Sequence, residues 1–305
     1  MFYGCDRASS TAGRLLVDSI ADLTGADVAA SVDLTGNATL GGDWDLEYIA
    51  GTVESAFAAQ SFAQSGWSGV LGQITVTTSA DTLDVDADTS SLANLALTPG
   101  ADGEISLREA VIAANTDIGP DIIFLAADNY RITDAATDDT GGDFDIRDDL
   151  SIVGISPKSS VIDGNNFSSV FDVHDDAAIT VTLANLKVQR GTTSPSAGED
   201  GAGLYVYGTV NTPDVYLTNV WFTGNFTTGV NDDGGAIYNE GRLTIETALI
   251  NNNFSDRGAG IFNTASGTLT MTNVTVSANN TYAIGGYQGG GLYNAGPATT
   301  SNSTF

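Results

Sequence analysis

Short runs of alternating apolar and polar residues, rich in Val, Ile and Thr and separated by Gly, Asn or Asp, fill the chain from about residue 121 onwards. Such alternation is typical of β-strands that bury one face. In the first part of this region we expect strands at 122–125, 130–132, 150–154, 161–164 and 170–173. The pattern therefore predicts a mainly β protein built from many short strands.

Internal repeats indicate how these strands are arranged. Four segments share a Gly-rich start followed by an aliphatic and an aromatic residue. Their aromatic residues are Tyr205, Tyr238, Phe262 and Tyr293. A second element follows the first three copies and begins at Leu217, Leu243 and Leu269. A repeat of this length holds about three short strands with their turns, which is one coil of a β-helix. The sequence thus predicts a right-handed parallel β-helix over 121–305.

Asparagines stand at the expected strand junctions, for example Asn185, Asn219 and Asn273. Asn adopts the left-handed backbone conformation at low cost, and stacked Asn side chains can hydrogen-bond to one another along the axis of the β-helix. We therefore predict a structural role for these residues and no catalytic one.

A single amphipathic helix is predicted before the β region, at 107–115. Ser106 and Glu109 have the spacing of a capping box, and Leu107, Ala110 and Val111 then share one face. A helix at this place would cover the open end of a solenoid. We assign 73–120 to this cap region.

The first 54 residues read as a small, partial α/β domain. Apolar residues between Ala12 and Leu23 have helical spacing, and 28–30 and 44–49 are short strand candidates. Residues 55–72 are small and uncharged, which is typical of a linker.

The net charge and the composition exclude some classes of binding partner. The chain has 10 Lys+Arg against 38 Asp+Glu, a formal net charge of −28. Such a surface repels phosphate backbones and anionic lipids, so nucleic acid is not expected as a partner. No stretch of 18 apolar residues occurs, so no membrane span is expected. The single Cys5 excludes an internal disulfide framework.

Several motifs resemble known bacterial families. Residues 105–111, ISLREAV, followed by Ala-Ala-Asn at 113–115, resemble the CSLREA domain, with Ile105 in place of that family's first Cys. The run 152–164 and the coils after it resemble pectin-lyase-like β-helices, and 234–239 resembles repeats of polymorphic outer-membrane proteins. The resemblance covers about 73–305. It implies a single-stranded β-helix in a secreted or surface-anchored bacterial protein.

The N-terminal part has a resemblance of its own. The segments 2–6, 23–31, 33–36 and 41–47 resemble the C-terminal part of an uncharacterised domain that opens giant bacterial surface proteins. The complete domain suggests a caspase-like α/β fold with a His-Gly motif upstream. On this basis we expect a fragment of a longer protein, with further β-helix or surface repeats beyond residue 305.

Cys5 is the first catalytic candidate. A thiol at a strand end becomes a nucleophile when a His lowers its pKa and takes its proton. The only His, His174, lies far away in the sequence on an expected β-coil. The sequence therefore favours a structural thiol and assigns no catalytic residue. A cysteine-peptidase-like domain stays as an alternative.

Polysaccharide cleavage is the second candidate, since pectin-lyase-like folds often perform it. Glycoside hydrolysis needs two carboxylates at a fixed separation. The Gly-His-Gly and paired-Asp motifs of polygalacturonases do not occur, and 192–305 hold only Arg242 and Arg257 as basic residues. Asp163 reads as a turn residue. A lyase or hydrolase is thus the alternative to a non-enzymatic scaffold.

Calcium is the third candidate. Three aspartates follow at alternate positions, and 102–109 looks like the later half of an EF-hand loop. The candidate ligands are Asp84, Asp86, Asp88, Asp102 and Glu109. The earlier EF-hand ligands are missing, because Thr98 and Gly100 occupy their positions. Two interpretations stay open, a calcium site and a solvated acidic loop beside a capped helix, and the sequence favours the loop.

Together these observations favour a non-enzymatic, adhesin-like scaffold without a required cofactor. Its variable loops, such as 191–201 and 226–234, would face a glycan, a matrix or a cell-surface ligand. The expected location is extracellular or at the bacterial cell surface. An enzyme would instead show converging carboxylates with a basic residue.

Overall fold

The computed structural model describes residue 8 and residues 11–32, 45–51, 72–117, 119–133, 141–193, 200–229, 231–282 and 289–305. Cys5 and most of the expected linker, 55–71, lie outside these residues. Among the described helices, none combines the length and apolar character needed to cross a lipid bilayer.

The N-terminal segment contains one helix and one antiparallel strand pair. Helix α1 (Thr11–Thr24) packs against β1 (Val28–Ala30) and β2 (Tyr48–Ala50), and Ala29 pairs with Ile49. Gly25 ends the helix with φ of 66°, a value that only glycine adopts freely, and its N–H donates to Ala21 O at 2.8 Å. The expected helix and the strand at 28–30 are confirmed, whereas the strand expected at 44–49 is shorter and covers 48–50.

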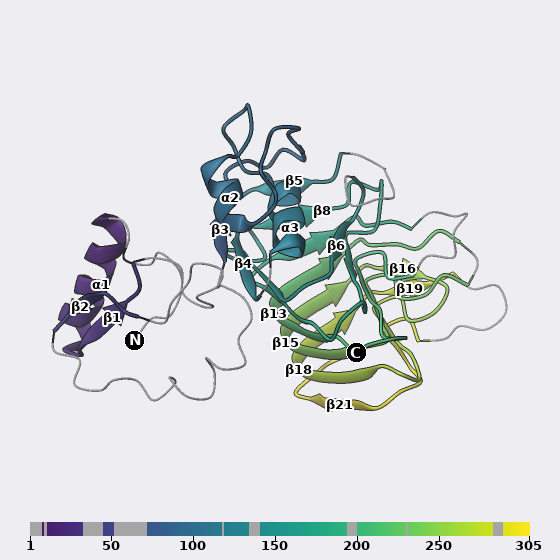
Figure 1. Cartoon of the computed structure of the whole chain (residues 1–305). Coiled ribbons are helices and arrows are strands. Elements are labelled where there is room, and N and C mark those ends of the chain that lie inside the picture. The colour runs from purple at the N-terminus through teal and green to yellow at the C-terminus, as the bar shows by residue number, and fades with distance from the viewer. Residues whose placement is uncertain are drawn as a thin grey trace.

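Parallel strands then stack into a β-solenoid of about six turns (Figure 1). Within the described residues, one sheet has eleven strands and a second has six. The eleven-stranded sheet contains β3 (Gln73–Thr75), β4 (Asp121–Phe124), β5 (Asn129–Arg131), β7 (Leu150–Val153), β8 (Val161–Asp163), β10 (Thr180–Ala184), β11 (Lys187–Gln189), β13 (Asp214–Thr223), β15 (Arg242–Asn251), β18 (Thr268–Ser277) and β21 (Ala298–Ser301).

The six-stranded sheet forms another face of each coil. Its strands are β6 (Phe144–Ile146), β9 (Phe171–Val173), β12 (Leu204–Val206), β14 (Ile237–Asn239), β17 (Ile261–Asn263) and β20 (Leu292–Asn294). Two short strands, β16 (Phe254–Ser255) and β19 (Asn280–Thr281), form a separate two-stranded parallel sheet. The predicted mainly β, parallel solenoid is confirmed.

Inward side chains form continuous apolar columns along the solenoid axis. In one column each residue pairs with the next coil, and all of its members are fully buried. The column consists of Ile123, Ile152, Leu183, Leu217, Ile245 and Met271. Burying one such side chain contributes roughly 1.5–3 kcal/mol. Because each coil is shielded by the coils above and below it, this stacking is the main source of stability.

The junction asparagines form the predicted corners. Asn185, Asn219 and Asn273 have φ of 56°, 51° and 57°, and Asn219 Nδ2 donates to Asn185 Oδ1 at 2.8 Å. Thr247 occupies the equivalent corner of β15 with φ of 57° and interrupts the Asn stack. The structural role predicted for these asparagines is confirmed.

The strand register between β13 and β15 differs from the one that the repeat spacing suggests. Leu217 and Leu243 begin equivalent repeat elements, but Leu217 pairs with Ile245, and Val215 pairs with Leu243. The shift is two residues. A two-residue shift keeps every apolar side chain on the inner face, so alternation alone cannot distinguish the two registers.

Two helices cover the first coil. Helix α3 (Leu107–Thr116) has the predicted capping box, with Ser106 Oγ accepting from Glu109 N and Glu109 accepting from Ser106 N. Its apolar face joins the solenoid core. The prediction of one helix was incomplete, because α2 (Leu92–Leu97) also covers this end. Ser91 caps α2, which has only six residues and so gives a weak periodic signal.

The expected strands between 121 and 173 are confirmed to within one residue at each end, as β4, β5, β7, β8 and β9. The sequence analysis missed β6, a strand of three residues in an Asp-rich segment. This strand begins the six-stranded sheet and carries part of the candidate functional site.

Candidate functional site

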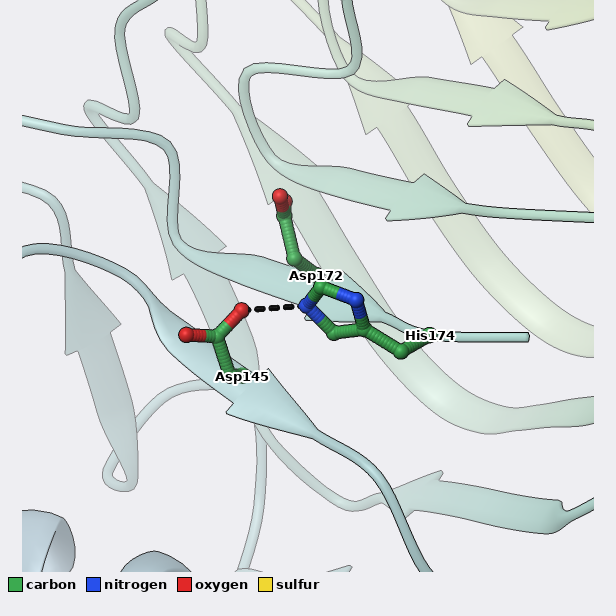
Figure 2. A group of neighbouring side chains, drawn as sticks. All are labelled: Asp145, Asp172 and His174. Atoms are coloured by element: carbon green, nitrogen blue, oxygen red, sulfur yellow. Dashed lines mark hydrogen bonds and ion pairs between the residues drawn. The ribbon is translucent and has the colours of Figure 1, made fainter. Parts of the chain in front are cut away.

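The outer face of the six-stranded sheet gathers the chemically distinctive side chains of the described residues. Strands β6 and β9 lie side by side and parallel, with Asp145 opposite Asp172. Alternate residues such as Phe144 and Phe171 point into the core and are buried. The residues between them therefore point outward. This alternation places Asp145, Asp172 and His174 on one outer surface (Figure 2).

Hydrogen bonds and ring contacts hold this group together. Asp145 Oδ1 forms a hydrogen bond with His174 Nε2, and Tyr207 OH donates to Asp172 Oδ2 at 3.4 Å. The imidazole of His174 stacks on the Tyr207 ring, with centroids 5.1 Å apart and planes at 12°. Arg147 lies at the edge, with Nη2 3.8 Å from Asp145 Oδ2. We call these residues, with Asp143, the acid–histidine cluster.

Asp143 adds a third carboxyl group to the cluster. Burial raises its pKa, the charge of Asp145 adds to the rise, and Ser168 Oγ donates to Asp143 Oδ1 at 3.2 Å. Burial also raises the pKa of Asp172 well above its ordinary value, with the charges of Asp143 and Asp145 next in size.

A row of aromatic rings continues from the cluster along the sheet. The outward residues of four consecutive strands stand in register at this position. They are Tyr205, Tyr238, Phe262 and Tyr293. Successive ring centroids lie 4.8, 5.2 and 4.5 Å apart. Tyr207 stacks on Tyr205 at 4.0 Å and so joins the row to His174. We call these rings, without His174, the aromatic ladder.

The ladder presents its edges more than its faces. The ring planes of Tyr238 and Phe262 are nearly parallel, at 1°, and those of Phe262 and Tyr293 are at 5°, so each ring covers the face of its neighbour. The Tyr residues of the ladder are partly exposed, whereas Phe262 is buried. The ladder therefore offers phenol hydroxyl groups and ring edges to a ligand.

Charged groups flank the ladder. Arg257 forms an ion pair with Asp233 and lies over Phe262, 5.0 Å from the ring centroid. Asp200 Oδ1 accepts a hydrogen bond from Asp233 N at 2.5 Å. Burial raises the pKa of Asp200 to about 7, and the charge of Asp233 adds to this. Glu240, also partly buried, has a raised pKa mainly because of burial.

The five candidate calcium ligands lie near one another, but their donor atoms do not converge as those of Asp145, Asp172 and His174 do. Asp84 N donates to Glu109 Oε1 at 2.8 Å, and Asp102 N donates to Asp84 Oδ2 at 3.2 Å. Asp86 Oδ1 accepts from Ala101 N, and Asp88 Oδ1 accepts from Ser90. Their side-chain oxygens thus bond to backbone N–H groups and a hydroxyl group. Calcium binding by these residues stays a prediction.

Of the two remaining candidates, Asp163 and Cys5, the structure describes only Asp163. Asp163, expected at a turn, ends β8, is fully buried and bonds to Gln189 Nε2 at 2.8 Å and Arg190 Nε at 2.9 Å. This ion pair gives Asp163 a structural role. Cys5 lies outside the described residues, so its surroundings are not part of the structure.

The sequence analysis missed most of the cluster. His174 was considered only as a partner for Cys5, and Asp143, Asp145 and Asp172 were not considered. The available signal was the alternation of polar and apolar residues in Asp143–Ile146 and Phe171–His174. Such alternation places the polar residues on one face, but pairing of the two strands is needed to bring them together.

Comparison with known proteins bears on the N-terminal part. Residues 1–71 match the family described as Domain of unknown function (DUF4347). The match stops before β3, so the solenoid and the acid–histidine cluster lie outside it. No curated protein and no solved structure matches the chain. The case for a function therefore rests on the chemistry of the outer sheet face.

Proposed function

We propose that this chain is a non-enzymatic binding scaffold, part of a secreted or surface-anchored bacterial protein, and that the aromatic ladder binds a neutral glycan. The observation that carries the proposal is the in-register row Tyr205, Tyr238, Phe262 and Tyr293 on one outer face. The resemblance of 105–115 to the CSLREA domain and of later coils to pectin-lyase-like and outer-membrane β-helices supports the surface location.

The chemistry of the face fits sugars. Phenol hydroxyl groups and the carboxylates of Asp200, Asp233 and Glu240 can pair with sugar hydroxyl groups, and ring edges add apolar contact. The formal charge of −28 disfavours acidic polysaccharides through long-range repulsion. A neutral chain lying along the ladder avoids this repulsion.

Binding to a panel of neutral and acidic glycans, measured by affinity electrophoresis and calorimetry, tests the proposal. Tyr238→Phe removes one hydroxyl group but keeps the ring stack, and Tyr238→Ala removes both. We expect affinity for the bound glycan to fall several-fold in the first variant and about tenfold or more, ~1.4 kcal/mol, in the second.

Tyr216 supplies the matched control. It is 43% exposed and lies on the other sheet, in β13. Tyr216→Ala should leave glycan affinity unchanged. Equal loss in Tyr216→Ala and Tyr238→Ala, or binding of no neutral glycan, would contradict the proposal.

A polysaccharide hydrolase or lyase is the second candidate, and one observation favours it. Asp143, Asp145 and Asp172 converge beside His174 and Arg147, which is the combination of carboxylates and a basic group expected of such enzymes. Incubation with the same panel, followed by assay of reducing ends and unsaturated products, decides between the two. Turnover that is lost in Asp172→Asn would replace the scaffold proposal by an enzyme.

A further inference from the structure

The acid–histidine cluster has the geometry of a metal site. Among the described residues, it contains the one group of three ligating side chains whose donor atoms all lie within 4.8 Å of one another. These side chains are Asp145, Asp172 and His174 (Figure 2). Asp145 comes from β6, Asp172 from β9, and His174 follows β9 directly.

A second observation points to a ligand at this place. Asp172 Oδ1 is shielded from solvent and accepts no hydrogen bond from the described residues. Its other oxygen, Oδ2, accepts a long hydrogen bond of 3.4 Å from Tyr207 OH. Buried polar atoms are almost always paired, and a buried carboxylate oxygen without a donor is a suitable ligand atom for a cation.

We propose that Asp145, Asp172 and His174 bind one divalent transition-metal ion, with Zn²⁺ as the best fit. An imidazole nitrogen with two carboxylate oxygens is a mixed donor set that Zn²⁺ and its neighbours accept, whereas Ca²⁺ and Mg²⁺ prefer oxygen ligands alone. Three protein ligands would leave a position open for water or a ligand group.

The surroundings support the orientation of the histidine. The Tyr207 ring lies against the imidazole with nearly parallel planes, which restricts rotation of the His174 side chain. Nε2 already faces Asp145 Oδ1. A metal ion would enter between these two atoms, in place of the proton that they share, with a small separation of β6 and β9 side chains.

Charge gives a further reason for a cation. Asp143, Asp145 and Asp172 converge here, and Arg147, the cation seen beside them, also pairs with Asp176, Nη1 to Oδ2 3.1 Å. A dication offsets the repulsion between these carboxylates. The proposed ion would therefore join two neighbouring coils at the start of the aromatic ladder.

Metal titration of the whole chain tests the proposal. Protein treated with chelator is titrated with Zn²⁺ by calorimetry and with Co²⁺ by visible absorption, in excess Ca²⁺. We expect one ion per chain, little competition from Ca²⁺, and a Co²⁺ spectrum of low coordination number. His174→Gln, Asp145→Asn and Asp172→Asn should each weaken binding at least about tenfold, ~1.4 kcal/mol.

Two further measurements separate a built site from adsorption on an acidic surface. Asp214→Asn removes a carboxylate on the other sheet that pairs with Arg242, and it should leave the affinity unchanged. Since His174 is the only histidine, its imidazole signals in nitrogen-resolved NMR should shift on addition of Zn²⁺ to the unaltered chain. Unshifted imidazole signals, or equal affinity in His174→Gln, would overturn the proposal.

Discussion

The guanidinium group of Arg108 and the carboxylate of Asp81 form an ion pair, Nε to Oδ1 2.7 Å, in which the side chains are only 3% and 4% exposed. Arg108 Nη2 also donates to Gly142 O at 2.7 Å, and the guanidinium lies 4.8 Å from the centroid of the Phe144 ring. Arg108 belongs to α3 and Phe144 to β6. Arg108 therefore joins the cap helix to the strand that begins the six-stranded sheet, and Asp81 holds its guanidinium group in place.

Arg108→Met is expected to lower the free energy of unfolding by roughly 3–5 kcal/mol, because it leaves the Asp81 carboxylate buried without its partner. The double variant Arg108→Met with Asp81→Asn should lose clearly less than the sum of the two single variants. Urea unfolding of all four proteins measures this coupling. Additive losses would show that the two side chains act independently.

Asn225, Asn253 and Asn279 form a hydrogen-bonded row along the solenoid, and this row should contribute to stability. Asn253 is fully buried; its Nδ2 donates to Phe222 O and Asn279 Oδ1, and its Oδ1 accepts from Asn225 N at 3.0 Å. Asn253→Ala leaves these partners unpaired and should cost about 3 kcal/mol. Chemical denaturation measures the loss. Thr270→Ala, on the outer face of β18, is the control and should cost less than about 0.5 kcal/mol.

Asp121 should make stability depend on pH. It is 1% exposed, neither carboxylate oxygen has a hydrogen-bond partner among the described residues, and burial with the charges of Asp117 and Asp148 raises its pKa to about 8 from 3.8. Between these values the folded chain keeps the proton and the unfolded chain loses it. Asp121 therefore makes the unfolding free energy fall as pH rises, by up to ~1.4 kcal/mol per pH unit.

Asp121→Asn removes this dependence. We expect it to raise the unfolding free energy by roughly 2–4 kcal/mol at pH 7 and to have little effect at pH 4, as measured by denaturation at both pH values. Asp128→Asn alters an exposed carboxylate in the same coil and is the control. Equal effects of Asp121→Asn at the two pH values would contradict the assignment of a raised pKa.

The aromatic ladder should stabilise the solenoid as well as bind. Phe262 lies between Tyr238 and Tyr293 and under Arg257, and it is 6% exposed. Phe262→Ala opens a gap in the stack and should cost roughly 3 kcal/mol. Tyr238→Phe, which keeps the stack, should cost less than about 1 kcal/mol. Thermal unfolding of both variants distinguishes stacking from hydroxyl contacts, and similar losses would argue against a stacking role.

Local patterns could be read correctly where a single segment contains the whole signal. Ser106 and Glu109 are three residues apart, so the capping box of α3 follows from the sequence alone. Asn219 adopts its left-handed corner for an equally local reason. Helix α2 was missed because six residues give too little periodicity, although Ser91 is a suitable cap.

The register and the candidate site required information from distant segments. Leu217 faces inward whether it pairs with Leu243 or Ile245, because the two alternatives differ by a full side-chain period. Asp145 and His174 meet only because β6 and β9 are adjacent strands in the stack. Strands β7 and β8 with their turns lie between β6 and β9 and complete one coil, and the length of that coil, which sets the pairing, carries no side-chain pattern.

The amino-acid sequence by itself determined that the chain winds into a parallel solenoid, because repeated alternation of apolar residues can be buried only by stacking like coils. It also determined the capped helix and the asparagine corners, which depend on neighbouring residues. Only the tertiary structure decided which coils align and which outward side chains touch. Those contacts join residues about thirty positions apart, and their free energy depends on the geometry of the whole stack rather than on any local preference.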